Sequence, residues 1–243
     1  EREWVKRVRH RMGHPDPKKF AVFLKDTHAD PKIIAGALEY QCDACGESQT
    51  GYSLARPAAI HAHLTFNEVI GMDTASWTND QGLRFTFVHF LDEGTLFHLG
   101  KRCAEDSDSQ LSCFGDTWLS WAGPPRQVYL DPASEYNSEK WLEAMQSEDI
   151  QLKMSAAESH WQLGRVEAHG RIVKRMLDLM NAEVPIRSEE EFDRAIRQVF
   201  CAKNSMSRVH GFTPEQAVLG VARRLPASVI SGTEASSHSL ADQ

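Results

Sequence analysis

The chain has 243 residues, of which 41% are hydrophobic and 25% charged, and its formal net charge is -7. This length allows a full hydrophobic core with room for one large and one small domain, and the composition is ordinary for a globular protein. The acidic balance argues against a protein that coats nucleic acid indiscriminately, no apolar run approaches the roughly 20 residues of a membrane span, and no secretory signal opens the chain.

The amino-terminal segment contains many basic residues and a set of potential metal ligands. Residues 1–25 include eight Lys or Arg and three acidic residues, so a local positive patch is expected despite the negative total. Two histidines and two cysteines follow one another with gaps of three, twenty-seven and two residues: His10, His14, Cys42 and Cys45. These residue types form the tetrahedral ligand set of a closed structural zinc site. The histidines are four residues apart, which predicts that both rings lie on one face of a helix.

Residues 20–40, between the two ligand pairs, are predicted to form a helix. A segment this small cannot build an adequate core alone, and a bound metal would hold it together. We therefore predict a small zinc-binding helical domain over residues 1–48. The alternative is two surface histidines with an unrelated, redox-active CxxC sequence. Five cysteines with one close pair do not make a disulfide framework, which favours a reducing intracellular compartment.

After a linker predicted at 49–62, strand and helix signals alternate. Strands rich in β-branched and aromatic residues are predicted over 65–72, 83–92, 95–102, 128–130 and 150–154. Helices are predicted over 107–121, over 20–40 as above, from Ser138 past Leu142 and Met145, over 164–182 and over 188–203, with a short last helix capped by Thr213. Residues 155–163 are predicted to form a loop, and residues 226–243 a disordered tail.

Three acidic residues occupy related places in this pattern. Asp73 follows the strand 65–72, Asp131 follows the strand 128–130, and Glu167 lies near the start of a long helix. Fifty-seven residues separate the two aspartates, and thirty-five separate Asp131 from Glu167. Clustered carboxylates repel one another unless a cation lies among them, and magnesium and manganese prefer oxygen ligands. The pattern therefore favours a divalent metal site.

The helix 164–182 has two distinct sides. Its buried stripe is predicted to consist of five residues at helical spacing: Val166, Gly170, Val173, Leu177 and Met180. Glu167, Arg171, Lys174 and Asp178 line the other side. Gly170 is a local conflict, because glycine inside a helix costs about 1 kcal/mol relative to alanine.

The sequences around the three acids resemble the catalytic core of the integrases of LTR retroelements of the gypsy or copia type. The matching stretches are Ile-Gly-Met-Asp-Thr at Asp73, Val-Tyr-Leu-Asp-Pro-Ala-Ser-Glu-Tyr at Asp131 and Gln-Leu-Gly-Arg-Val-Glu at Glu167. The 35-residue gap is that family's spacing. The histidine and cysteine set resembles the family's amino-terminal HHCC domain, and residues 204–220 resemble the stretch that closes its cores. The resemblance covers about residues 10–225.

This resemblance implies an α/β, RNase H-like core over residues 63–225, with a mixed five-stranded sheet and flanking helices, after the zinc-binding domain. It implies two Mg²⁺ or Mn²⁺ ions held by Asp73, Asp131 and Glu167, and one structural Zn²⁺. The implied activity is that of a DDE-type integrase, a metal-dependent polynucleotidyl transferase. Such an enzyme trims the 3′ ends of element DNA and joins them to target DNA by transesterification.

The resemblance also implies double-stranded DNA, both element ends and target, as the partner. Arg171 and Lys174, beside Glu167, and His160 and Gln162, in the predicted loop, are expected to contact it. The alternatives are a solvated helix face with intrahelical ion pairs and ordinary solvent-facing loop residues. A homo-oligomer, dimer or tetramer, is expected, together with neighbouring domains of a Pol polyprotein, since Glu1 stands where an initiator Met would be. We expect no membrane association, and a nuclear location after a cytoplasmic particle stage.

One stretch departs from the family pattern. Pro132-Ala133 follows Asp131 where many members have Asn-Gly, and proline removes a backbone donor and fixes φ, so the metal loop is expected to differ in shape. Two other functions remain open. One is a catalytically inactive or host-adopted relative that binds DNA or serves in assembly, and the other is a different nuclease of the same fold, such as an RNase H. We identify no strand-rich basic module like the third domain of complete integrases.

Overall fold

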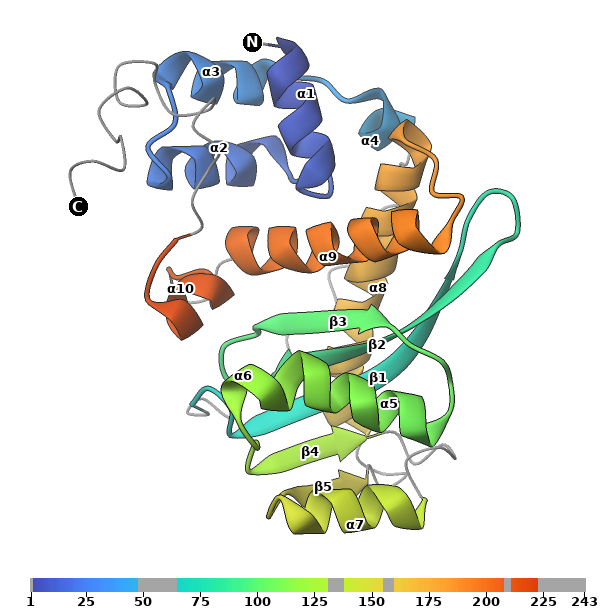
Figure 1. The fold of residues 1–243 in the computed structure, drawn as a ribbon. Helices are drawn as coiled ribbons and strands as arrows, with labels where there is room; N and C mark the ends of the chain where they lie inside the picture. Colours follow the sequence, from blue (N-terminus) through green and yellow to red (C-terminus); the bar gives the residue numbers. More distant parts are fainter. Residues whose placement is uncertain (1, 48–64, 131–137, 155–159, 208–210, 223–243) are drawn as a thin grey trace, which may run out of the picture.

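A computed structural model describes residues 2–47, 65–130, 138–154, 160–207 and 211–222. Four helices come first in the chain: α1 (Arg2–Arg11), α2 (Pro17–Asp26), α3 (Pro31–Glu39) and α4 (Asp43–Glu47). A single sheet with helices on both faces follows (Figure 1). The predicted linker and the predicted disordered tail lie outside the described residues.

The sheet is mixed and has five strands. They are β1 (Val69–Thr78), β2 (Arg84–Asp92), β3 (His98–Arg102), β4 (Gln127–Leu130) and β5 (Gln151–Met154). Their spatial order is β3-β2-β1-β4-β5. The pairs β1–β2 and β2–β3 are antiparallel, whereas β1–β4 and β4–β5 are parallel. The sheet confirms the number of strands and the mixed arrangement predicted from the sequence.

Helices cover the two faces of this sheet and create two hydrophobic cores. One face packs against a broken helix, α5 (Ser107–Phe114), the π-helical segment η1 (Gly115–Leu119) and α6 (Ser120–Ala122), and against α7 (Glu139–Ser147). The other face packs against α8 (His160–Glu183) and α9 (Glu189–Met206), and α10 (Pro214–Leu219) ends the described chain. In Figure 1, α8 crosses behind the strands while α5 and α6 lie in front of them.

The patterning of α8 agrees with its predicted burial. All five members of the predicted stripe, from Val166 to Met180, are buried, and Glu167, Arg171 and Asp178 are exposed. The last two helices begin with capping boxes, because Ser188 pairs reciprocally with Glu191 and Thr213 with Gln216. The predicted cap at Thr213 is therefore confirmed.

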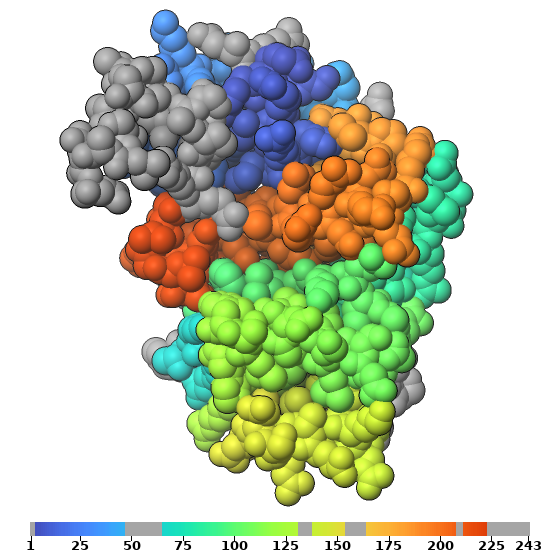
Figure 2. Space-filling model, viewed as in Figure 1, coloured from blue at the N-terminus to red at the C-terminus, as the bar shows by residue number. Residues whose placement is uncertain are grey.

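The amino-terminal helices rest on the rest of the molecule. Their small core, which includes Val5, Phe20 and Leu24, also takes in Met206 from α9. Helix α9 lies between α1 and α2 on one side and β3 on the other (Figure 1). In the space-filling view the blue amino-terminal helices adjoin the orange surface of α8 and α9 without a gap (Figure 2).

The predicted single helix over 20–40 is wrong. The chain forms two helices, and each begins with the same sequence, an aspartate followed by a proline. Asp16 caps α2 and Asp30 caps α3, each by accepting backbone N–H bonds, while Pro17 and Pro31 occupy the first turns. Proline has no N–H to donate and fits the first turn of a helix, so the second Asp-Pro pair starts a new helix.

The predicted end of the first strand is also wrong. It was expected to finish before Asp73, but β1 continues to Thr78 and pairs with β2 along its whole length. Aspartate is uncommon in strands. The pairing with β2 and the burial of Ala75 and Trp77 nevertheless extend β1 past Asp73. Asp73 therefore lies in the middle of a strand.

Two apolar side chains of the predicted helices lie partly outside the core. Leu142 is 50% exposed, unlike its neighbour Trp141, which is fully buried. Trp121 is 43% exposed, although its ring contacts those of Phe66, Phe97 and Trp118. Among the described residues no helix is long and apolar enough to cross a membrane.

Candidate functional site

Asp73 faces α8. Ala75 and Trp77, two and four residues further along β1, belong to the core beneath α8 and α9, and alternate residues of a strand share a face. The side chain of Asp73 is 25% exposed. Its carboxylate thus lies on the α8 side of the sheet, with an open path to solvent.

Glu167 is on the part of α8 that crosses β1 and β2 next to Asp73. Its neighbour Val166 packs so closely on Gly71 that a methyl group at Gly71 would overlap the valine side chain. Three residues after Glu167, a methyl group at Gly170 would lie 2.9 Å from Nε2 of His89, which pairs with Asp73 across the strands. Both glycines let the helix approach the sheet. Glu167 therefore lies on the turn of α8 that contacts Gly71 and His89, the neighbours of Asp73 in the sheet.

An ion pair fixes the same part of α8. Arg165 Nη1 lies 2.8 Å from Glu93 Oε2 and donates to the Glu93 carbonyl oxygen at 3.0 Å. Burial raises the pKa of Glu93 to about 7, against the opposing effect of the Arg165 charge. This contact joins the residue two before Glu167 to the turn between β2 and β3, and the sequence reasoning did not anticipate it.

The remaining predicted residues of this site are described only in part. Asp131 lies outside the described residues, and the described part of β4 ends at Leu130. Helix α8 begins at His160, so the predicted loop was wrong for residues 160–163. His160 and Gln162 therefore belong to the first turn of this helix.

Arg171 and Lys174 extend from the solvent side of α8. The Arg171 side chain is 70% exposed and its Nη1 lies 4.0 Å from Glu167 Oε2, while Lys174 is half-buried. An exposed pair this long contributes little to stability, so the arginine is available to an anionic partner.

The second predicted site lies where α1, α4 and α8 meet. His14 Nδ1 is 3.3 Å from Cys42 Sγ and 3.7 Å from Cys45 Sγ. In a tetrahedral zinc site, bonds of about 2.3 Å to sulfur and 2.0 Å to nitrogen give a sulfur–nitrogen separation of about 3.6 Å. These three residues form one group able to hold a metal ion. Their spacing matches the requirement of zinc.

His10 does not belong to the group of His14, Cys42 and Cys45, although it was predicted as the fourth ligand. Helix α1 ends at Arg11, so the two histidines do not share one helix, and His14 has a positive φ of 55°. The rings of His10 and His14 are nonetheless in edge contact, with centroids 5.6 Å apart. His10 Nδ1 lies 2.9 Å from Glu183 Oε2, and His10, His14 and Glu183 form a second group able to hold a metal.

Burial controls the protonation of these ligands. It lowers the pKa of His14 to about 4, against the smaller opposing effect of Glu183, so the ring is neutral and able to ligate. It raises the pKa of the Cys42 thiol to about 11, and a backbone hydrogen bond at Cys45 and the Arg9 charge oppose this rise only in part. His14 Nε2 is buried without a hydrogen-bond partner among the described residues. A neutral imidazole and a thiol that a cation would deprotonate fit a zinc ion.

Glu183 is the residue of this site that sequence reasoning missed. It comes from the last turn of α8, 141 residues from Cys42, whose Sγ lies 3.4 Å from Glu183 Oε1. Arg9 supplies a nearby positive charge, with Nη2 3.6 Å from Cys45 Sγ. Spacing rules for His and Cys do not include a distant glutamate, so no sequence signal pointed to it.

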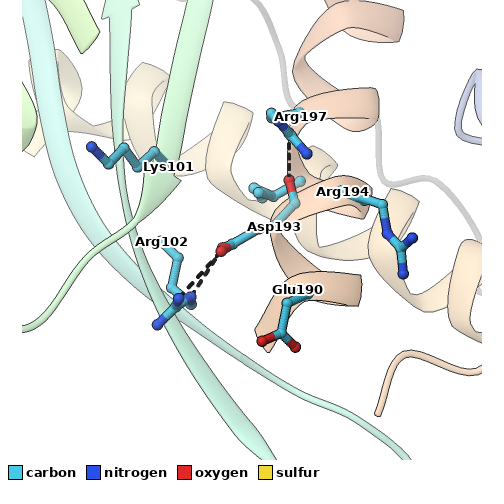
Figure 3. A pocket seen from close by; sticks show the side chains of 7 residues that line it. Lys101, Arg102, Glu190, Asp193, Arg194 and Arg197 are labelled. Atoms are coloured by element: carbon cyan, nitrogen blue, oxygen red, sulfur yellow. Dashed lines mark hydrogen bonds and ion pairs between the residues drawn. The ribbon is translucent and has the colours of Figure 1, made fainter. Parts of the chain in front are cut away.

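A hollow of about 580 Å³ lies elsewhere, between β3 and α9, and contains none of the predicted site residues (Figure 3). Its most central cation, Arg102, is bound to Asp193 at 2.9 Å and to Glu189 at 2.9 Å. Asp193 also accepts a hydrogen bond at its backbone oxygen from Arg197. The two carboxylates neutralise the Arg102 charge, and we assign no function to the hollow.

Known structures resemble this fold. The catalytic core of HTLV-2 integrase in complex with magnesium, dimeric form, has a TM-score of 0.54 and 19% identity, and covers 63% of this chain and 97% of that one. The intasome of simian T-cell lymphotropic virus in complex with PP2A regulatory subunit B56 gamma has a TM-score of 0.61 and 18% identity, and covers 87% and 74%.

These similarities define the fold class. With the sheet order above, they confirm the predicted RNase H-like integrase core fold. No family model matches the sequence, and no curated protein sequence matches it.

Proposed function

We propose that the chain is an integrase of an LTR retroelement, a DDE-type polynucleotidyl transferase that processes and joins the ends of element DNA. The observation that supports this most is the approach of α8 to β1, which brings Glu167 and Asp73 to the same side of an integrase-like sheet. Asp131 is the third proposed acid, since it directly follows β4, which is parallel to β1 and adjacent to it.

The three carboxylates would hold two Mg²⁺ or Mn²⁺ ions, which activate the attacking oxygen and stabilise the leaving oxygen of an in-line displacement. Asp73, partly exposed at the face of the sheet, suits a ligand shared by both ions. Glu167, on a solvent-facing side of α8, suits a ligand of one ion. Arg171 and Lys174, with His160 and Gln162, are proposed to bind phosphates of double-stranded DNA next to the scissile bond.

The direct test is a strand-transfer assay with duplex DNA that carries element ends, in magnesium and in manganese. We expect a trimmed 3′ end followed by a joined product, because only the nucleophile changes between the two steps. The oligomeric state of the protein should be measured under the same conditions, since joining two DNA ends requires at least two active sites.

Other outcomes distinguish the competing functions. A folded, metal-replete protein that binds DNA but yields no product in either metal would favour an inactive or host-adopted relative. Cleavage of RNA in a hybrid without DNA joining would favour an RNase H.

We further propose that His10, His14, Cys42 and Cys45 bind one structural Zn²⁺. Glu183, whose Oε2 lies 2.9 Å from His10 Nδ1, would orient that ring. Carboxylates commonly orient metal-binding histidines in this way, and their loss costs about 10- to 100-fold in metal affinity.

Glu183→Gln is expected to weaken zinc binding about tenfold, because a neutral amide holds the histidine less firmly. Competition with a chelator of known affinity measures this effect. Asp178→Asn is the matched control, because Asp178 is a carboxylate of the same helix that accepts a hydrogen bond from Trp77 Nε1. Equal zinc affinity in the wild type and in Glu183→Gln would remove Glu183 from the site.

A further inference from the structure

Behind Asp73 lies a buried group of polar side chains that the proposed chemistry does not use. His89 and His98 are fully buried on β2 and β3, His169 is mostly buried on α8, and Lys203 is 4% exposed on α9. Buried ionisable groups are costly unless they have partners. A series of four such groups that begins beside one carboxylate therefore calls for a role.

These side chains connect in series. His89 Nε2 lies 3.5 Å from Asp73 Oδ2, and His89 Nδ1 lies 3.0 Å from His98 Nε2. The His98 and His169 rings meet edge to face, with centroids 5.9 Å apart. Lys203 Nζ lies 2.7 Å from His169 Nδ1. Contact therefore runs from the face of the sheet to α9.

The direction of the hydrogen bond between His89 and His98 follows from the charge of Asp73. An N–H at His89 Nε2 is favourable against the Asp73 carboxylate, whereas a lone pair there is not. His89 Nδ1 must then accept, so His98 Nε2 donates to it. Burial, together with the nearby Lys203, lowers the pKa of His98 well below its ordinary value, which agrees with a neutral ring that has one N–H.

The backbone of His98 is itself held in place. Asn204 Oδ1 accepts from His98 N at 2.9 Å, and Asn204 Nδ2 donates to His98 O at 2.8 Å. The Asn204 amide thus forms the two backbone hydrogen bonds that a neighbouring strand would form at the edge of β3. It thereby fixes the position of His98, whose ring orients His89. On the other side, Gly170 leaves room for His89 Nε2, which explains why α8 tolerates a glycine in its interior.

We propose that His89 is a positioning residue that fixes the orientation of the Asp73 carboxylate, and that His98 and Asn204 set the tautomer and place of His89. This inference rests on the proposed function, in which Asp73 is a metal ligand. The contact of the His89 ring with one carboxylate oxygen, at 3.5 Å, restricts rotation of the group, so the other oxygen is presented to the metal in one orientation. His89 is fully buried and acts on the metal through Asp73.

The test compares two substitutions of His89. His89→Gln retains an N–H donor that can reach Asp73, whereas His89→Leu fills the space without one. The full-length protein is treated with EDTA and then reloaded with zinc. Its binding of Mn²⁺ is measured from the electron paramagnetic resonance signal of the Mn²⁺ that remains free. We expect about tenfold weaker Mn²⁺ binding in His89→Leu and a change of no more than about threefold in His89→Gln.

Controls separate positioning from packing and from the proposed function. Phe85→Leu, at a buried residue on the same face of β2 whose ring stacks on Trp77 and Phe192, reduces packing away from His89 and should leave Mn²⁺ affinity unchanged. Asp73→Asn should abolish the Mn²⁺ site. If Asp73→Asn binds as well as the wild type, the proposed function fails. If Asp73→Asn loses Mn²⁺ binding but His89→Leu binds Mn²⁺ like the wild type, the positioning role is overturned. It is also overturned if His89→Gln binds Mn²⁺ as weakly as His89→Leu and the two variants have equal melting temperatures.

Discussion

Replacing Glu167 with glutamine is expected to lower the rate of DNA strand transfer by at least about a thousandfold, while DNA binding changes little. A neutral amide binds a divalent cation poorly, and metal ions contribute several kcal/mol of transition-state stabilisation, each 1.4 kcal/mol of which is about tenfold in rate. Glu167 is exposed and its only described ion pair, with Arg171, is 4.0 Å long, so the fold does not depend on it. Strand-transfer rates and fluorescence-anisotropy titrations with DNA measure the two quantities.

Glu143→Gln provides the comparison for this experiment. Glu143 is an exposed glutamate on α7, so its replacement makes the same change of charge elsewhere on the surface. Its activity should equal that of the wild type. Activity of Glu167→Gln within tenfold of the wild type would remove Glu167 from the catalytic site.

Replacing Cys42 with serine is expected to release the zinc ion and unfold the four amino-terminal helices. Zinc binding contributes about 10–16 kcal/mol to small zinc-dependent folds, far more than the few apolar side chains of this unit can replace. The loss of zinc is measured by elemental analysis after gel filtration, and unfolding by the loss of helical circular dichroism and by proteolysis. The sheet and its own two cores should stay folded.

Cys201→Ser is the matched change for that variant. Cys201 is a free, partly buried cysteine on α9, away from the histidines. It should retain one zinc ion per chain. A Cys42→Ser protein with the zinc content of the wild type would contradict the zinc assignment.

Sequence patterns predicted the elements that local chemistry determines. The alternating strands and the stripe on α8 were readable because apolar residues repeat with the period of the element that buries them. The Thr213 cap was readable from its position before Pro214. His14, Cys42 and Cys45 were predicted as ligands from their residue types and spacing, and they lie in one group, even though the segment between them forms two helices rather than one.

What could not be predicted depends on contacts between distant segments. The full length of β1 follows from its pairing with β2, the role of Glu183 follows from α8 lying beside α4, and the histidine group behind Asp73 joins three separate elements. Gly170 looked like a defect in a helix and is explained by a ring on another strand. Such residues have no periodicity or motif, because only the tertiary fold brings their partners to them.

Helix α8 bears a residue of each proposed metal centre. Glu167 and Glu183 are sixteen residues apart, about 24 Å of continuous helix. Adding or deleting one residue between them would rotate one glutamate about 100° relative to the other and shift it by about 1.5 Å. Changes in the length of this segment are therefore not tolerable, and single-residue insertions there should be more damaging than insertions at the tip of the β1–β2 hairpin.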